Sequence, residues 1–132
     1  MEQQVVAEAK FPAGRAKSFL LDHDWVEITR GEPVDLADFD LGVCFQCGLA
    51  TITRDGAILP ATSEVEVQVK REGEGWVDVF KNAWTLGSLD THEDEIKVPG
   101  EGMVLIRARK SAQLTSDVRD DVALVARRRA SA

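Results

Sequence analysis

The sequence of 132 residues contains no tyrosine, only two cysteines and two histidines, and no long apolar run. Its apolar runs span a few residues, whereas about 20 are needed to cross a bilayer. The N-terminus lacks the basic start and apolar centre of a secretory signal peptide, so a cytoplasmic location is the expectation. Cys44 and Cys47 lie three positions apart. They cannot link distant segments, so no disulfide framework of the kind used by small secreted domains is expected.

Basic residues are fewer than acidic ones, at 16 against 23, and the formal net charge is -7. Such a charge repels the phosphate backbone, which disfavours nucleic acid as the main partner. The length fits one domain with one core. Apolar residues at 44% and charged residues at 30% are a globular balance that argues against a disordered chain.

The clearest pattern is the strict alternation and glycine-bearing turn of residues 63–80, SEVEVQVKREGEGWVDVF. Side chains alternate across a sheet with a period of two. Val65, Val67 and Val69 therefore share one face of a strand, and the polar residues between them share the other. We expect a β-hairpin whose valine face lies in the core.

Further strands are predicted on both sides of this hairpin. Trp25 and its neighbours alternate over residues 25–29. Residues 41–53 fit either one long strand with a bulge near Gly48 or two shorter strands. Residues 103–106 are apolar at every position, which predicts an interior strand covered on both faces.

The last segment, residues 116–128, fits two patterns. Val118, Val122 and Val125 would form the apolar stripe of a helix, whereas Val122 and Leu124 belong to an alternating strand. The strand is favoured because everything before it is β.

These short strands, about eight in number and without intervening helices, predict an all-β fold. The expected architecture is an antiparallel β-sandwich or jelly roll with extended terminal arms, and a small closed barrel is the alternative. The sandwich domain would cover residues 18–126. Residues 1–17 would form an N-terminal arm and residues 127–132 a basic C-terminal tail.

Cys44 and Cys47 form a CxxC pair, which can hold zinc or exchange disulfides. Structural zinc needs four ligands, and only the isolated His23 and His92 remain to complete a set. A redox pair belongs at the start of a helix, where the thiol pKa falls, whereas these cysteines lie in an apparent strand. We interpret them as packed or surface thiols. No metal or other cofactor is predicted.

His92 belongs to the acidic segment DTHEDE of residues 90–95. Such a segment could attract a divalent cation, but it lacks the glycine-spaced pattern of a calcium loop and is interpreted as a solvated acidic loop. His23 lies between two aspartates and could act as a base. No nucleophile elbow indicates a partner serine, so the protein is not expected to be an enzyme.

Two tryptophans flank the second strand of the hairpin. Trp76 and Trp84 could form a sugar-stacking platform, because indole faces pack against the apolar faces of sugars. Packing in the core or at a subunit interface is the other interpretation of these two residues.

The layout of residues 25–109 resembles small β-sandwich structural proteins of tailed-phage virions, such as head-decoration, connector-associated and spike-base subunits. The sequences that carry this resemblance are WVEIT with GEPV, the hairpin VEVQVKREGEGWVDVF, and IKVPGEGMVLIRARKS. The resemblance implies a soluble, site-poor β domain whose arms and sheet edges contact neighbouring subunits.

The predicted function is therefore a non-enzymatic assembly subunit of a virion, acting as a homo-oligomer through protein–protein contacts. Its contacts would include the terminal arms, and in particular Arg127, Arg128 and Arg129. The alternative is a carbohydrate-binding module that uses Trp76 and Trp84. A small hydrolase or metal-binding protein is the third possibility.

Overall fold

The computed structural model describes residues 14–111 and 117–129. Within these residues the chain is almost entirely β, with twelve strands and one short 3-10 helix, η1, at Leu36–Asp38. In chain order the strands are β1 Ala16–Leu20, β2 Val26–Glu27, β3 Val34–Asp35, β4 Phe39–Phe45, β5 Ala50–Ile52, β6 Ile58–Leu59, β7 Ala61–Lys70, β8 Trp76–Leu86, β9 His92–Ile96, β10 Met103–Lys110, β11 Val118–Arg119 and β12 Ala123–Arg128.

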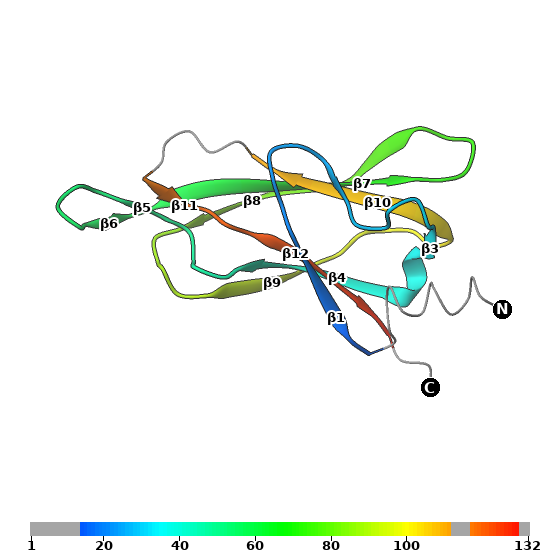
Figure 1. Ribbon diagram of the computed structural model, residues 1–132, viewed down its shortest axis with the longest axis horizontal. Helices are drawn as coiled ribbons and strands as arrows, with labels where there is room; N and C mark the ends of the chain where they lie inside the picture. Colours follow the sequence, from blue (N-terminus) through cyan, green and yellow to red (C-terminus); the bar gives the residue numbers. More distant parts are fainter. Residues whose placement is uncertain (1–13, 112–116, 130–132) are drawn as a thin grey trace.

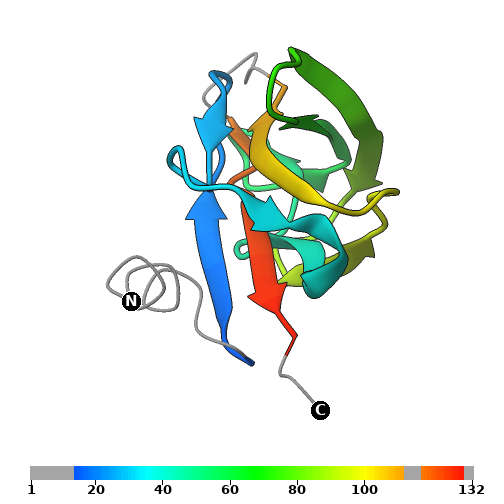
Figure 2. The ribbon, with the colours of Figure 1, turned by 90° about the vertical axis from the view of Figure 1, so that its right-hand side faces the viewer.

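Two antiparallel sheets pack face to face as a sandwich (Figure 1). Sheet A has the order β1-β12-β4-β9, and sheet B has the order β2-β10-β7-β8, with β3 also paired to β10. A smaller sheet, β11-β5-β6, extends from one end. In Figure 2, β1 (blue) and β12 (red) lie side by side in sheet A. This architecture confirms the predicted antiparallel sandwich; the strand number exceeds eight because several strands are only two or three residues long.

The core lies between the two sheets and follows the alternation of the sequence. Val65, Val67 and Val69 of β7 are each no more than 1% exposed, and Val43 and Phe45 of β4 meet them from the other sheet. Burying each such side chain contributes about 1.5–3 kcal/mol. The remaining buried apolar residues of the core are Leu21, Ile28, Leu36, Phe39, Leu41, Leu49, Trp84, Ile96, Val104, Ile106, Ala108, Val122, Leu124 and Ala126.

Strand β10 is an interior strand, as predicted, because it pairs with β7 on one side and with β2 and β3 on the other. Only one of its faces is covered. Val104 and Ile106 are buried in the core, whereas Leu105 is half-buried and Met103 is 58% exposed. The prediction that both faces are covered is therefore wrong: in the described part of the chain, the outer face of β10 is partly exposed.

A tight turn at Gly48 divides residues 41–53 into the two strands β4 and β5. Gly48 has a φ of +75°, and a Cβ at this position would lie 2.1 Å from the backbone oxygen of Ser88. The backbone of the next residue, Leu49, donates to that same oxygen at 2.9 Å. Only glycine fits this close approach of two chain segments.

A bulge in β8 reverses the direction of its side chains. Phe80 pairs with Val67 and Asp78 pairs with Gln68, so Val79 between them has no partner in the ladder. One extra residue in an alternating strand moves all later side chains to the other face.

The C-terminal segment is a strand, which confirms the favoured alternative for residues 116–128 as far as the structure describes them. Arg127 and Arg128 belong to β12 rather than to a tail, and the N-terminal residues Ala16 and Lys17 belong to β1, which pairs with it. Residues 1–13 and 130–132 of the predicted arms lie outside the described residues.

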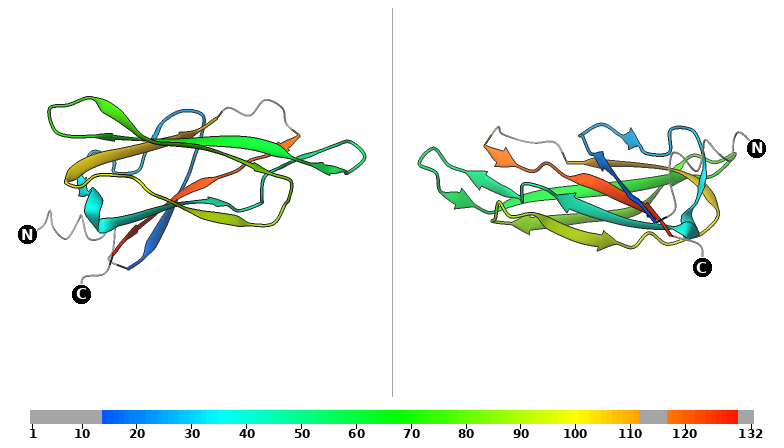
Figure 3. Two further views of the ribbon diagram at one scale, coloured as in Figure 1. Left: turned by 180° about the vertical axis from the view of Figure 1, so that it is seen from behind. Right: turned by 60° about the horizontal axis from the view of Figure 1, so that its bottom comes forward.

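The connection into β12 carries a buried ion pair. The Nζ of Lys110 lies 3.1 Å from Oδ1 of Asp120, and the two side chains are only 12% and 5% exposed. The pair joins the end of β10 in sheet B to the segment that leads into sheet A. Figure 3 shows from two further sides how the chain passes repeatedly between the layers.

The acidic segment is a strand, not the loop that the sequence analysis predicted. Residues His92–Ile96 form β9, which pairs with β4 at the edge of sheet A. Across the described residues, no helix combines the length and apolarity that a membrane crossing would require.

Candidate functional site

Tryptophan and arginine side chains gather on the outer face of sheet B. Because β10 alternates, Arg107 and Arg109 point away from the core that Ile106 and Ala108 help to form. Trp25 lies just before β2, and Trp76 begins β8. We call the group of Trp25, Trp76, Arg107 and Arg109 the Trp–Arg face.

The four side chains of the Trp–Arg face form a continuous series of cation–π contacts. The Cζ of Arg107 lies 4.2 Å from the ring centre of Trp76 and 4.5 Å from that of Trp25. The Cζ of Arg109 lies 4.3 Å from the Trp25 ring. Each such contact contributes about 0.5–1 kcal/mol at an exposed site and more where water is excluded.

Hydrogen bonds to neighbouring strands fix both guanidinium groups. Arg107 donates from Nε and Nη2 to Oε1 of Gln68 on β7, at 2.8 and 2.6 Å. Gln68 in turn donates to Oδ1 of Asp78 on β8 at 2.7 Å. Arg109 donates from Nε to Oε2 of Glu66 at 2.8 Å. The arginine planes are thus held in position before any partner arrives.

Partial burial lowers the pKa of Arg107, and the neighbouring positive charge of Arg109 lowers it further. The guanidinium remains protonated at physiological pH, because an arginine side chain keeps its proton in proteins. A partly desolvated cation attracts an aromatic ring more strongly than a fully hydrated one. The same partial burial therefore strengthens the stack.

An apolar hollow of about 230 Å³ lies at the end of the same face. It adjoins the Trp–Arg face because Leu105 in its wall pairs with Lys70, which pairs with Trp76. The residues that line the hollow are Pro33, Lys70, Arg71, Glu72, Met103 and Leu105. A face of ordered tryptophan and arginine side chains beside an apolar hollow has the composition of the centre of a protein–protein interface.

Trp76 and Trp84 do not form the common platform that the sequence suggested. Trp84 is 7% exposed, donates from Nε1 to Asp94 at 3.0 Å, and packs edge-on against Phe45 with ring centres 5.7 Å apart. The bulge at Val79 is the cause, because it turns Trp84 into the core and Trp76 outward. Trp84 is thus part of the core.

Three members of the Trp–Arg face were missed by sequence reasoning. Arg107 and Arg109 alternate with apolar residues of β10, and Trp25 alternates with Val26 in the same manner. Those alternations were signals for outward-facing residues. Nothing local indicated that the segment before β2 would lie beside β10.

The basic residues assigned to a contacting tail are tied into sheet A. Arg127 and Arg128 pair with Asp40 and Phe39 of β4. Arg129 donates from Nε to Oδ1 of Asp40 at 3.0 Å. These arginines therefore belong to the strand ladder or its immediate end.

The two histidines lie apart from each other. His23 is in an exposed loop with its Nδ1 2.7 Å from the Asp22 carboxylate, and the hydrogen bond from the His23 backbone lowers the pKa of that carboxyl. His92 is in β9, its ring centre 6.3 Å from that of Phe45. In the described part of the chain, no three His, Cys, Asp or Glu side chains gather in a way that could hold a metal ion.

Both cysteines are free thiols in different settings. Cys47 is exposed in the turn after β4, and Cys44 is half-buried in the strand. Burial raises the pKa of the Cys44 thiol, and the adjacent Glu93 carboxylate, 3.8 Å from its sulfur, raises it further. A raised pKa keeps the thiol protonated and less nucleophilic at neutral pH.

Comparison with protein-family models and with curated proteins finds no match to this chain.

Proposed function

We propose that this protein is a non-enzymatic subunit that acts by binding other protein subunits through the Trp–Arg face. The observation that carries the proposal is the series of contacts from Arg109 through Trp25 and Arg107 to Trp76 on the outer face of sheet B. Tryptophan and arginine supply a large share of binding energy at protein interfaces.

The preorganised geometry of this face supports binding to a protein rather than to a sugar. Arg107 contacts both Trp25 and Trp76, so these indoles already hold guanidinium groups where a sugar would stack. Ordered side chains lose little conformational entropy when a partner docks, which favours affinity.

A structural subunit of a phage virion is the specific form of this proposal. It rests on the resemblance of residues 25–109 to such subunits, and the sandwich fold that the resemblance implied supports it. In this form the partners are neighbouring subunits of the assembly.

Affinity capture of stoichiometric partners from the source cells or particles, followed by binding measurements with the purified partner, tests the proposal. The double variant Trp76→Ala/Arg109→Ala removes both ends of the stack. In this variant the Glu66 carboxylate still has a cationic neighbour, because the Nζ of Lys81 lies 3.6 Å from its Oε1. Lys97→Ala is the control, because this exposed cation directly follows the edge strand β9 of the other sheet, sheet A.

We expect the double variant to weaken binding at least tenfold and the control to bind like the parent. Equal affinity of all three proteins for the captured partner would overturn the proposal, provided that circular dichroism shows the same fold for each. Turnover of a substrate that tracks the concentration of the pure protein would also overturn it.

A further inference from the structure

The hairpin formed by β5 and β6 projects from one end of the sandwich, at the left of Figure 1. Hydrogen bonds close its turn. The backbone N–H of Thr53 donates to the backbone oxygen of Ala57, and the backbone N–H of Ala57 donates to the Thr53 hydroxyl, both at 2.9 Å. The Thr53 hydroxyl also bonds the Asp55 carboxylate, which lowers the pKa of that carboxyl and keeps it charged. The hairpin is therefore an ordered projection rather than a loose loop.

Two consecutive apolar residues of this hairpin are about half exposed to solvent. Ile58 is 48% exposed and Leu59 is 47% exposed. Neighbours in a strand point to opposite faces, so both faces of the hairpin are apolar at this point. An ordered, projecting apolar element of this kind marks a contact site.

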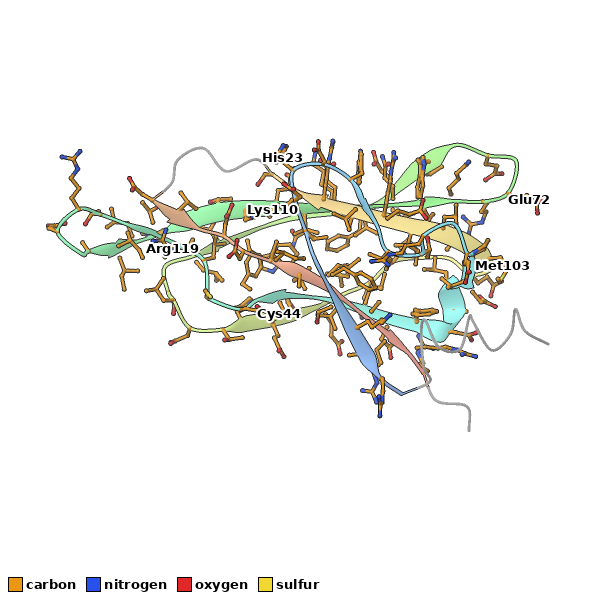
Figure 4. All side chains as sticks on the ribbon, viewed as in Figure 1. His23, Cys44, Glu72, Met103, Lys110 and Arg119 are labelled. Carbon is orange, nitrogen blue, oxygen red and sulfur yellow. The ribbon has the colours of Figure 1, made fainter. Side chains whose placement is uncertain are left out.

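The apolar hollow beside the Trp–Arg face lies at the other end of the molecule. Figure 4 labels two of its lining residues, Met103 and Glu72, at the right, opposite the hairpin at the left. The hairpin and the hollow lie at opposite ends of the longest axis, so they cannot meet within one chain. A second copy can bring them together.

The charges around the two features are complementary. The turn of the hairpin carries one cation and one anion, Arg54 and Asp55, and the rim of the hollow carries two cations, Lys70 and Arg71, and one anion, Glu72. A hairpin that lies along the hollow can therefore place each of its charges near one of opposite sign. Charge pairing at the rim fixes register more than affinity.

A stable interface needs more contact area than the hairpin alone can provide. A specific interface buries about 800 Å² on each partner, more than the end of a short hairpin provides. The Trp–Arg face adjoins the hollow through Lys70 and Trp76. When the hairpin of a second copy is seated in the hollow, the sandwich of that copy would lie against the Trp–Arg face and supply the remaining contact area.

We propose that the hairpin of one copy docks in the hollow beside the Trp–Arg face of the next copy, with Leu59 and Ile58 against Met103 and Leu105. This inference rests on the proposed function and names its partner as a second copy of the chain. The two surfaces differ, so the contact is heterologous. Repetition of such a contact gives a closed ring or an open filament.

Complementary blocking variants test the proposal by sedimentation velocity and native mass spectrometry. Leu59→Asp blocks the hairpin and Met103→Asp blocks the hollow; both side chains are about half exposed or more, so the fold should survive. The parent should assemble beyond a dimer. Each variant alone should be monomeric, and an equimolar mixture should give a capped 1:1 dimer, because each variant keeps the surface that the other lacks.

A cysteine pair tests the same contact directly. In a background of Cys44→Ala and Cys47→Ser, a mixture of Leu59→Cys and Met103→Cys proteins should form a disulfide-linked heterodimer on mild oxidation. The exposed pair Leu89→Cys with Met103→Cys is the control and should not cross-link efficiently.

A monomeric parent at all concentrations, or variants that assemble like the parent, would overturn the head-to-tail contact. Failure here is distinguishable from failure of the proposed function. If the Trp–Arg face variant loses its captured partner while the parent remains monomeric, the binding function stands and only the self-docking is refuted.

Discussion

The strongest single test of the Trp–Arg face is whether Arg107 and Trp76 are energetically coupled. Arg107→Met keeps an unbranched stem but removes the charge and the planar group. The variant loses two cation–π contacts, at 4.2 and 4.5 Å, which together amount to about 1–2 kcal/mol. It also loses the charge-assisted hydrogen bonds to Gln68, which contribute about 1.5–3 kcal/mol.

Because the single variant mixes these losses, a double-mutant cycle with Trp76→Leu is needed to isolate the stacking contact. We expect a coupling energy of about 0.5–1 kcal/mol, the value of one partly exposed cation–π contact. The free energies of unfolding would be measured by urea titration of the four proteins at constant salt, followed by circular dichroism. A second cycle with Trp25→Leu should give a similar value.

The control cycle pairs Trp76→Leu with Lys81→Met on the same face. Lys81 forms ion pairs with Glu64 and Glu66. It lies five positions after Trp76 along β8. Its coupling energy should be near zero. An Arg107 coupling no larger than this control would refute the stack as an energetic unit, and with it the preorganisation on which the proposed binding face depends.

Three further changes test other parts of the structure by urea unfolding or thiol labelling. Gly48→Ala should destabilise the fold by about 2–5 kcal/mol, because the position has a positive φ and the new Cβ would clash with the backbone. Gly56→Ala is the control, because this glycine also has a positive φ but has open space around it, and it should cost only about 1–2 kcal/mol. Equal losses of stability in the two variants would contradict the close approach of the chain at Gly48. Asp120→Asn should cost about 1.5–3 kcal/mol, because it removes the buried carboxylate nearest to the Lys110 ammonium and leaves only the exposed carboxylate of Asp121, at 4.0 Å. A loss below that of an exposed ion pair would contradict the burial. Cys44 should be alkylated more slowly than the exposed Cys47 at neutral pH, and its alkylation should become faster as the pH rises toward the raised pKa of its thiol. Glu93→Gln should lower the pKa of Cys44 and accelerate its alkylation. An unchanged rate in this variant would contradict the role of the Glu93 carboxylate.

The sequence predicted the fold class because the strongest determinant of a sandwich is local. Alternation of Val65, Val67 and Val69 with polar residues forces one apolar face on β7. Pro60 before the strand and the glycine-bearing turn at Gly73 after it limit the strand length. Covalent geometry alone sets this period. The buried valine face of β7 was accordingly readable without any knowledge of the strand order.

The candidate site was much less predictable, because it depends on which strands become neighbours. Trp25 and Arg107 are far apart in the sequence and meet only because β2 pairs with β10. The acidic segment of β9 lacks a strand pattern of its own and becomes a strand by pairing with β4. Cross-strand contacts of this kind override local propensity.

The sequence by itself therefore determined the class of fold, the buried face of the central hairpin and the turns that bound its strands. Tertiary structure decided the faces of Trp76 and Trp84, which lie an even number of positions apart and would share a face in a regular strand. The unpaired Val79 separates them, one to the surface and one to the core. A bulge is a property of two paired strands, set by how their core residues align, so no single strand sequence reveals it.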